Sequence, residues 1–132
     1  MTAARTSLSI GALVATALAG TITLATPASA HGGDDGVIKR GSCTNAGTWK
    51  LKAKHDDGQI EVEFEVDTNR AGKTFKVRLS DNRDVFFRGQ RTTQPPSGSF
   101  EVERRTANRA GTDVIRGHAV RGDNVCAGTV RL

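Results

Sequence analysis

Aromatic residues are scarce in this chain of 132 residues, which holds no tyrosine, one tryptophan and five phenylalanines. Proteins that bind single-stranded nucleic acids or sugars commonly stack the ligand on exposed aromatic rings. Trp49 instead belongs to an alternating apolar pattern that is typical of a core. The composition therefore argues against a nucleic-acid partner and against an aromatic carbohydrate platform.

Short catalytic motifs are also missing. The chain contains no G-x-S-x-G, no H-E-x-x-H and no G-x-x-x-x-G-K-[ST], the patterns of common hydrolases, zinc proteases and phosphate-binding loops. Its most regular acids, Glu61, Glu63 and Glu65, fit a strand surface faced by lysines better than a calcium site or an acid–base pair. We therefore predict a protein without catalytic activity and without a cofactor.

Residues 1–30 have the organisation of a signal peptide. Arg5 precedes an uncharged, mostly apolar run that ends in Ala28-Ser29-Ala30, the small-x-small pattern after which signal peptidase cleaves. The leader holds one Arg and no acid, so cleavage would lower the net charge from +5 to +4. An uncleaved membrane anchor is the alternative, which Pro27 and the polar residues of the run disfavour. We expect a secreted, extracellular protein with no membrane span after cleavage.

The two cysteines, Cys43 and Cys126, predict one disulfide in an exported chain. The bond would close a loop of 83 residues, for which the chain-entropy model gives roughly 4.5 kcal/mol. The chain has no C-x-x-C motif and no histidine close to either cysteine, which argues against a zinc site and against a redox pair.

Alternation of apolar and polar residues from residue 48 onward predicts half-buried strands. The clearest pair surrounds Asp57-Gly58, a dipeptide typical of a type I′ hairpin turn. A turn there places residues 49, 51 and 53 opposite 66, 64 and 62 on the apolar face. The same register places Lys50, Lys52 and Lys54 opposite Glu65, Glu63 and Glu61 on the polar face, so both faces favour it.

Further strands are predicted for residues 73–80, 85–91, 99–105, 113–120 and 125–132. With about seven strands and little helix, the fold class is expected to be all-β, an antiparallel immunoglobulin-like β-sandwich with one disulfide. We expect a flexible N-terminal arm at 31–47 and the β-sandwich domain at 48–132. Strict alternation would point Phe86 and Phe87 to opposite faces of their strand, leaving one of the two exposed or at a sheet edge.

Five segments are spread along most of residues 31–132: IEVEFEVDTNRAG at 60–72, RTT at 91–93, SGSFEV at 97–102, ANRAG at 107–111 and CAGTVRL at 126–132. In them the chain resembles a group of small secreted immunoglobulin-like β-sandwich proteins of high-GC Gram-positive bacteria. No activity is assigned to that group. The resemblance therefore implies secretion and the sandwich, and it transfers no catalytic or binding residue.

A copper site is one functional hypothesis. Cleavage after residue 30 would make His31 the first residue, and a terminal histidine chelates Cu(II) through its amine and imidazole. His118 and His55 are the candidates for a second ligand. The following Gly32-Gly33 would cost entropy to order, which counts against the site.

Binding to an anionic surface is the other functional hypothesis, and its alternative is an ordinary solvated surface with arginines interspersed among acids. The second half of the chain is richer in arginine than the first, and the predicted binding residues are Arg88, Arg91, Arg104, Arg105 and Arg109. Such a surface would attract an anionic cell-wall polymer or an extracellular protein. The sequence thus predicts a secreted, non-catalytic binding module of the cell envelope or extracellular space, with a copper-binding protein as the alternative.

Overall fold

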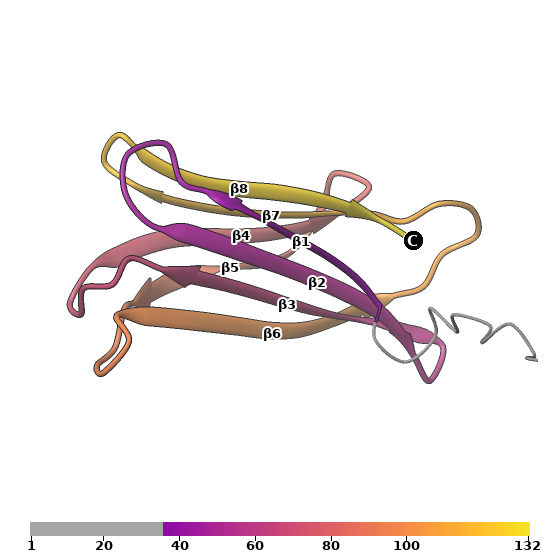
Figure 1. Ribbon diagram of the computed structural model, residues 1–132. Helices are drawn as coiled ribbons and strands as arrows, with labels where there is room; N and C mark the ends of the chain where they lie inside the picture. Colours follow the sequence, from indigo (N-terminus) through magenta and orange to yellow (C-terminus); the bar gives the residue numbers. More distant parts are fainter. Residues whose placement is uncertain (1–35) are drawn as a thin grey trace, which may run out of the picture.

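Eight strands and no helix make up residues 36–132, the part of the chain that the computed structural model describes (Figure 1). In chain order the strands are β1 (Val37–Ser42), β2 (Thr48–Asp56), β3 (Gln59–Asp67), β4 (Thr74–Asp81), β5 (Asp84–Thr92), β6 (Ser99–Ala107), β7 (Val114–Arg121) and β8 (Asn124–Arg131).

The strands form two four-stranded sheets, in the order β1-β2-β3-β6 (sheet A) and β5-β4-β7-β8 (sheet B). Every pairing is antiparallel. Contacts between the sheets place β8 against β1 and β2 on one side of the sandwich, and β5 against β6 on the other. The all-β sandwich with one disulfide is therefore confirmed, and the architecture is consistent with an immunoglobulin-like domain.

The core lies between the sheets and is built from alternate residues of nearly every strand, as half-buried strands require. Its largest fully buried side chains include Phe64 and Leu51 in sheet A, and Phe75, Leu79 and Ile115 in sheet B. This arrangement confirms two predictions, that the protein contains little helix and that apolar side chains alternate with polar ones along its strands.

The first hairpin, β2–β3, has the register expected from its sequence. Leu51 lies opposite Phe64 and Ala53 opposite Val62, and all four are fully buried. Asp57 and Gly58 have φ angles of 48° and 75°, the left-handed backbone that a type I′ turn needs. The turn and the apolar pattern thus select the same pairing.

The prediction of a flexible arm at 31–47 is wrong for part of that range, because Val37–Ser42 forms β1. This strand pairs with β2 from Val37 opposite Ala53 to Ser42 opposite Thr48, which raises the strand count from about seven to eight. β1 is an edge strand with exposed charges at Lys39 and Arg40, a common way to protect an edge. The segment VIKRGS therefore lacks the apolar alternation on which the sequence prediction relied.

A β-bulge in β5 determines how the adjacent residues Phe86 and Phe87 are oriented. Leu79 lies opposite Phe87 but Ser80 lies opposite Val85, so Phe86 is the extra residue without a partner in β4. A bulge interrupts the alternation of side chains. As a result Phe86 and Phe87 are both partly buried against the core, not one inward and one outward as strict alternation predicts. Both lie on β5, an edge strand of sheet B, so the expected edge position is correct.

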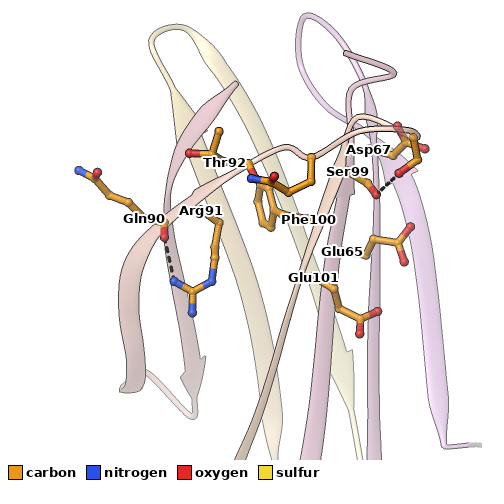
Figure 2. Close-up of a pocket in the computed structure, with 10 residues that line it drawn as sticks. Glu65, Asp67, Gln90, Arg91, Thr92, Ser99, Phe100 and Glu101 are labelled. Carbon is orange, nitrogen blue, oxygen red and sulfur yellow. Dashed lines mark hydrogen bonds between the residues drawn. The ribbon is translucent and has the colours of Figure 1, made fainter. Parts of the chain in front are cut away.

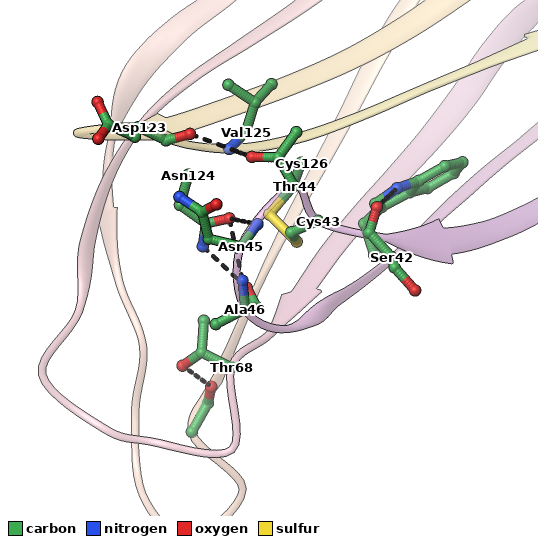
Figure 3. The surroundings of a disulfide bond; sticks show 12 residues. Ser42, Cys43, Thr44, Asn45, Ala46, Thr68, Asp123, Asn124, Val125 and Cys126 are labelled. Carbon is green, nitrogen blue, oxygen red and sulfur yellow. Dashed lines mark hydrogen bonds between the residues drawn. A yellow bond between two sulfur atoms is a disulfide. The ribbon is translucent and has the colours of Figure 1, made fainter.

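The predicted disulfide is present and fastens the two sheets together (Figure 3). It joins Cys43, just after β1, to Cys126 in β8 across a sequence separation of 83 residues. Polar contacts support the same junction: the Thr44 hydroxyl accepts a hydrogen bond from the Val125 amide at 2.9 Å, and the Asn124 side-chain oxygen accepts one from the Asn45 amide at 3.0 Å.

Within residues 36–132 there is no helix long and apolar enough to cross a membrane. The predicted signal peptide at 1–30 and the histidine that would follow it lie outside the described residues.

Candidate functional site: a basic face on sheet B

The outer faces of the two sheets differ in charge. On sheet A the three expected lysine–glutamate pairs form, with N–O distances of 3.0 Å for Lys50–Glu65, 3.7 Å for Lys52–Glu63 and 3.1 Å for Lys54–Glu61. Next to them, exposed Glu101 and Glu103 of β6 lie opposite Glu65 and Glu63. Sheet A therefore presents neutralised pairs, bordered by carboxylates on β6 and by the exposed Arg40 on β1.

Sheet B presents cations instead. In β4 the alternation that buries Phe75, Val77 and Leu79 turns the residues between them outward. The same alternation in β5, β7 and β8, together with the β4–β5 turn, brings seven basic residues to one surface. This surface, called the basic face below, consists of Lys76, Arg78, Arg83, Arg88, Arg116, His118 and Arg131.

Two shallow grooves run over the basic face and share Arg78. One groove, of about 500 Å³, is lined by the basic residues Lys76, Arg78, Arg88 and His118 and by uncharged residues. The other, of about 770 Å³, is lined by the remaining arginines of the face and by hydroxyl and amide side chains. Neither groove has an Asp or Glu in its lining. In the described part of the chain, no carboxylate lies within 4.0 Å of the charged nitrogens of the six lysine and arginine side chains.

One row of the basic face crosses three strands. Arg78 lies directly opposite Arg88 in β5 and directly opposite His118 in β7. Burial, and the charges of Arg78 and Arg116, lower the pKa of His118 from its ordinary value of 6.5. Burial, together with the cations around the imidazole, therefore favours its neutral form, and an anion placed on the row would oppose the effect of the cations.

The five arginines predicted from the sequence are not brought together. Arg88 lies on the basic face. Arg105 instead reaches carboxylates of sheet A, at 2.6 Å from Asp56 and 3.2 Å from Glu61. Arg109, after β6, is paired with Asp84, which also raises the pKa of Arg109. Two of the five are thus already neutralised by partners.

The remaining two, Arg91 and Arg104, stack on one ring. Their guanidinium carbons lie 5.1 Å and 4.6 Å from the centroid of Phe87, within the range of a cation–π interaction. They lie where β5 meets β6, and a cleft of about 780 Å³ opens on this side of the sandwich (Figure 2). In Figure 2 the Arg91 side chain of β5 lies across the cleft from Glu101 of β6, and Arg91 donates a hydrogen bond to the Gln90 carbonyl at 2.8 Å. The lining also includes Glu65 and Asp67, so this cleft is of mixed charge and does not select anions.

The two histidines that the structure describes lie on different sheets. His55 is exposed near the end of β2, where its Nδ1 lies 3.2 Å from the side-chain nitrogen of Asn108. His118 lies on the outer face of sheet B. Among residues 36–132 there is no group of three His, Cys, Asp or Glu side chains placed to hold a metal ion. His31 lies outside these residues, so the copper hypothesis stays a prediction.

A buried pair of acids forms a second unusual cluster. Asp81, at the end of β4, and Asp113, just before β7, are each 1% exposed. None of their four carboxylate oxygens has a hydrogen-bond partner within the described residues. Burial, and then the neighbouring carboxylate of Asp113, raise the pKa of Asp81 above its ordinary value of 3.8. The protonated form of Asp81 is therefore favoured in the folded protein.

Sequence reasoning missed most of the basic face. The outward positions of Lys76 and Arg78 can be read from the alternation in their strand. Arg116 and Arg131 come from β7 and β8, and only the order β5-β4-β7-β8 places β7 beside β4 and β8 beside β7. No local pattern in the sequence specifies that order.

Comparison with known proteins adds no relative. No protein family model, no curated protein and no solved structure matches this chain.

Proposed function

We propose that this protein is a secreted, non-catalytic binding module of the cell envelope or extracellular space, and that it holds an anionic polymer on its basic face. The observation that carries the proposal is the one-sided charge of the sandwich. Seven basic residues share the outer face of sheet B and two grooves without a carboxylate in their lining, whereas sheet A pairs its lysines with glutamates.

Like charges on neighbouring strand positions destabilise a sheet unless something compensates them. In water the cost is small, because each exposed pair contributes only tenths of a kcal/mol. A polyanion converts the same arrangement into many simultaneous attractions and releases its counterions on binding. An extended polymer suits the face better than a small anion, because the grooves are shallow and spread over four strands.

Secretion is part of the proposal. It is supported by the leader pattern at residues 1–30 and by the disulfide, which is typical of oxidising compartments. Amino-terminal sequencing of the protein recovered from culture medium tests it. A first residue of His31 supports cleavage after Ala30, and recovery of the protein only in the membrane fraction with an intact leader contradicts it.

Binding of the purified protein to isolated cell-wall material, measured as a function of salt, tests the ligand. We expect the logarithm of the binding constant to fall linearly with the logarithm of salt concentration, and the double variant Arg78→Gln/Arg116→Gln to reduce that slope by roughly 1–2. The matched control is Arg40→Gln/Arg70→Gln, which removes the same charge at exposed positions outside the basic face.

The control variant should bind like the unmodified protein. If both double variants lose binding equally, net charge and not the basic face is responsible. If binding is absent at low salt, or is independent of salt, the proposed function is wrong.

A further inference from the structure

The row Arg88–Arg78–His118 is the most concentrated part of the basic face. Arg78 has a cation directly opposite it on one side and an imidazole directly opposite on the other. Lys76, two residues before Arg78, lines the same groove. Arginine side chains present planar forks that match the paired oxygens of phosphate and carboxylate groups. The row therefore has the donors for one anionic oxygen group, and no carboxylate in the groove lining competes with it.

The surroundings of His118 contain cations and no acids. From its own strand β7, Arg116 lies on the same face two residues away, and from β4 the facing groups are Arg78 and Lys76. Across the groove, β5 contributes Arg88. On the other side β8 places uncharged Ala127 directly opposite His118. The protonation of His118 thus depends on its burial, on the neighbouring cations and on any anion that the groove holds.

We propose that the groove formed by Lys76, Arg78, Arg88 and His118 is a subsite for one phosphodiester or carboxylate group of the polymer, and that His118 takes up a proton when the group binds. The inference rests on the proposed function, since the polymer that occupies the basic face supplies the anionic group. It adds the place where one charge of the polymer is held and a linkage between binding and pH.

The linkage follows from the arrangement of charges. In the free protein, burial and the neighbouring arginines oppose protonation of His118, whereas an anion between Arg78 and His118 favours it. By thermodynamic reciprocity, a ligand that promotes protonation must itself bind more tightly when the group is protonated. Affinity for the polymer should therefore increase as the pH falls through the range in which histidine titrates.

The test follows the ring signals of His118 by NMR during pH titrations with and without a polymer whose charge does not change in that range. Linear poly(glycerol phosphate) supplies phosphodiesters, and polygalacturonate supplies carboxylates. We expect bound polymer to raise the pKa of His118 and to leave His55, on the other sheet, unchanged. Binding should be about tenfold tighter at about pH 5.5 than at about pH 7.5. The polymer that produces both effects identifies the class of anion.

Variants distinguish the contribution of the subsite to binding from that of the basic face as a whole. His118→Gln should bind with the same affinity at both pH values, and His55→Gln should keep the original pH dependence. Arg78→Gln should raise the pKa of His118 in the free protein and also weaken binding, because Arg78 lowers that pKa and donates to the anion.

Failure of the inference and failure of the proposed function give different results. If a polymer binds in a salt-dependent way through Arg78 and Arg116 but leaves the His118 signals and the pH dependence unchanged, the subsite is wrong and the proposed function stands. If neither polymer nor wall material binds at low salt, the proposed function is wrong and the subsite falls with it.

Discussion

The indole of Trp49 occupies the space that a side chain at Gly128 would need. A Cβ atom built on Gly128 would collide with Cζ3 of the indole, and one built on Gly41 would lie 2.5 Å from its Cζ2. Trp49 belongs to β2, whereas Gly41 and Gly128 belong to β1 and β8. The ring is therefore inserted where the two sheets meet beside the disulfide, and the two glycines allow the close approach.

Gly128→Ala should lower the free energy of unfolding by about 2 kcal/mol, because the indole must move out of a filled space. Thr129→Ala, on the outer face of the same strand, is the control and should change it by less than about 0.5 kcal/mol. Denaturant titration measures both. If Gly128→Ala is as destabilising in a Trp49→Leu background as in the unmodified protein, the collision is not the cause.

Asp81→Asn should stabilise the protein at neutral pH. A buried carboxyl whose pKa is raised in the folded state binds its proton more tightly there than when unfolded, so stability is greatest at or below about pH 3.8 and falls as the pH rises toward the folded pKa. Asparagine removes that loss and can donate a hydrogen bond to the carboxylate of Asp113. We expect a gain of about 2 kcal/mol at about pH 7, which disappears in acid.

The control for this change is Asp57→Asn, which removes one charge at the exposed hairpin turn. Asparagine tolerates the left-handed backbone that Asp57 already adopts at φ 48°, so stability should change little. Thermal unfolding across the acid-to-neutral range distinguishes the two variants. A loss of stability for Asp81→Asn at neutral pH would show that the ionised carboxylate has a partner that stabilises it.

Removal of the disulfide by Cys43→Ala/Cys126→Ala should lower the free energy of unfolding by roughly 4 kcal/mol, because the unfolded chain regains the entropy of an open loop of 83 residues. The m-value should rise, since the unfolded state exposes more surface. Urea titration measures both quantities. A loss below about 1 kcal/mol would mean that the polar contacts of Thr44 and Asn124 hold the two sheets together without the bond.

Arg83→Gly should raise stability while weakening binding to anionic polymers. Arg83 has a φ of 78° in the β4–β5 turn, a conformation that costs a non-glycine residue about 1 kcal/mol. Arg83→Gln removes the same charge and keeps the strain. Both variants should lose affinity equally, and only the glycine variant should gain stability in thermal unfolding. Unchanged affinity in both variants would show that Arg83 does not contribute to polymer binding.

The first hairpin was predictable because several local signals agree. The Asp57-Gly58 turn, the apolar alternation and the lysine–glutamate pairing each select the same register, and each involves residues close in sequence. The disulfide was predictable for a simpler reason, since the chain contains only two cysteines.

Features that depend on tertiary context were not predictable. The bulge at Phe86 arises from a shift in pairing with β4 that leaves no distinctive residue pattern, and β1 is an edge strand whose sequence lacks apolar alternation. The basic face depends on which strands become neighbours in sheet B. Arginines that are close in sequence, such as Arg104 and Arg105, point to opposite sides of β6 and end with different partners.

The unequal charge of the two outer faces gives the molecule an electric dipole that runs from one sheet to the other. Near a negatively charged surface the dipole would orient the molecule before contact, with sheet B leading. Bound molecules would then turn sheet A outward, with the carboxylates of Glu101 and Glu103 facing the medium. Arg40 and Arg105 on the same face offset these two charges, so a wall coated in this way would present a more nearly neutral exterior, and further copies would be attracted less than by the bare wall.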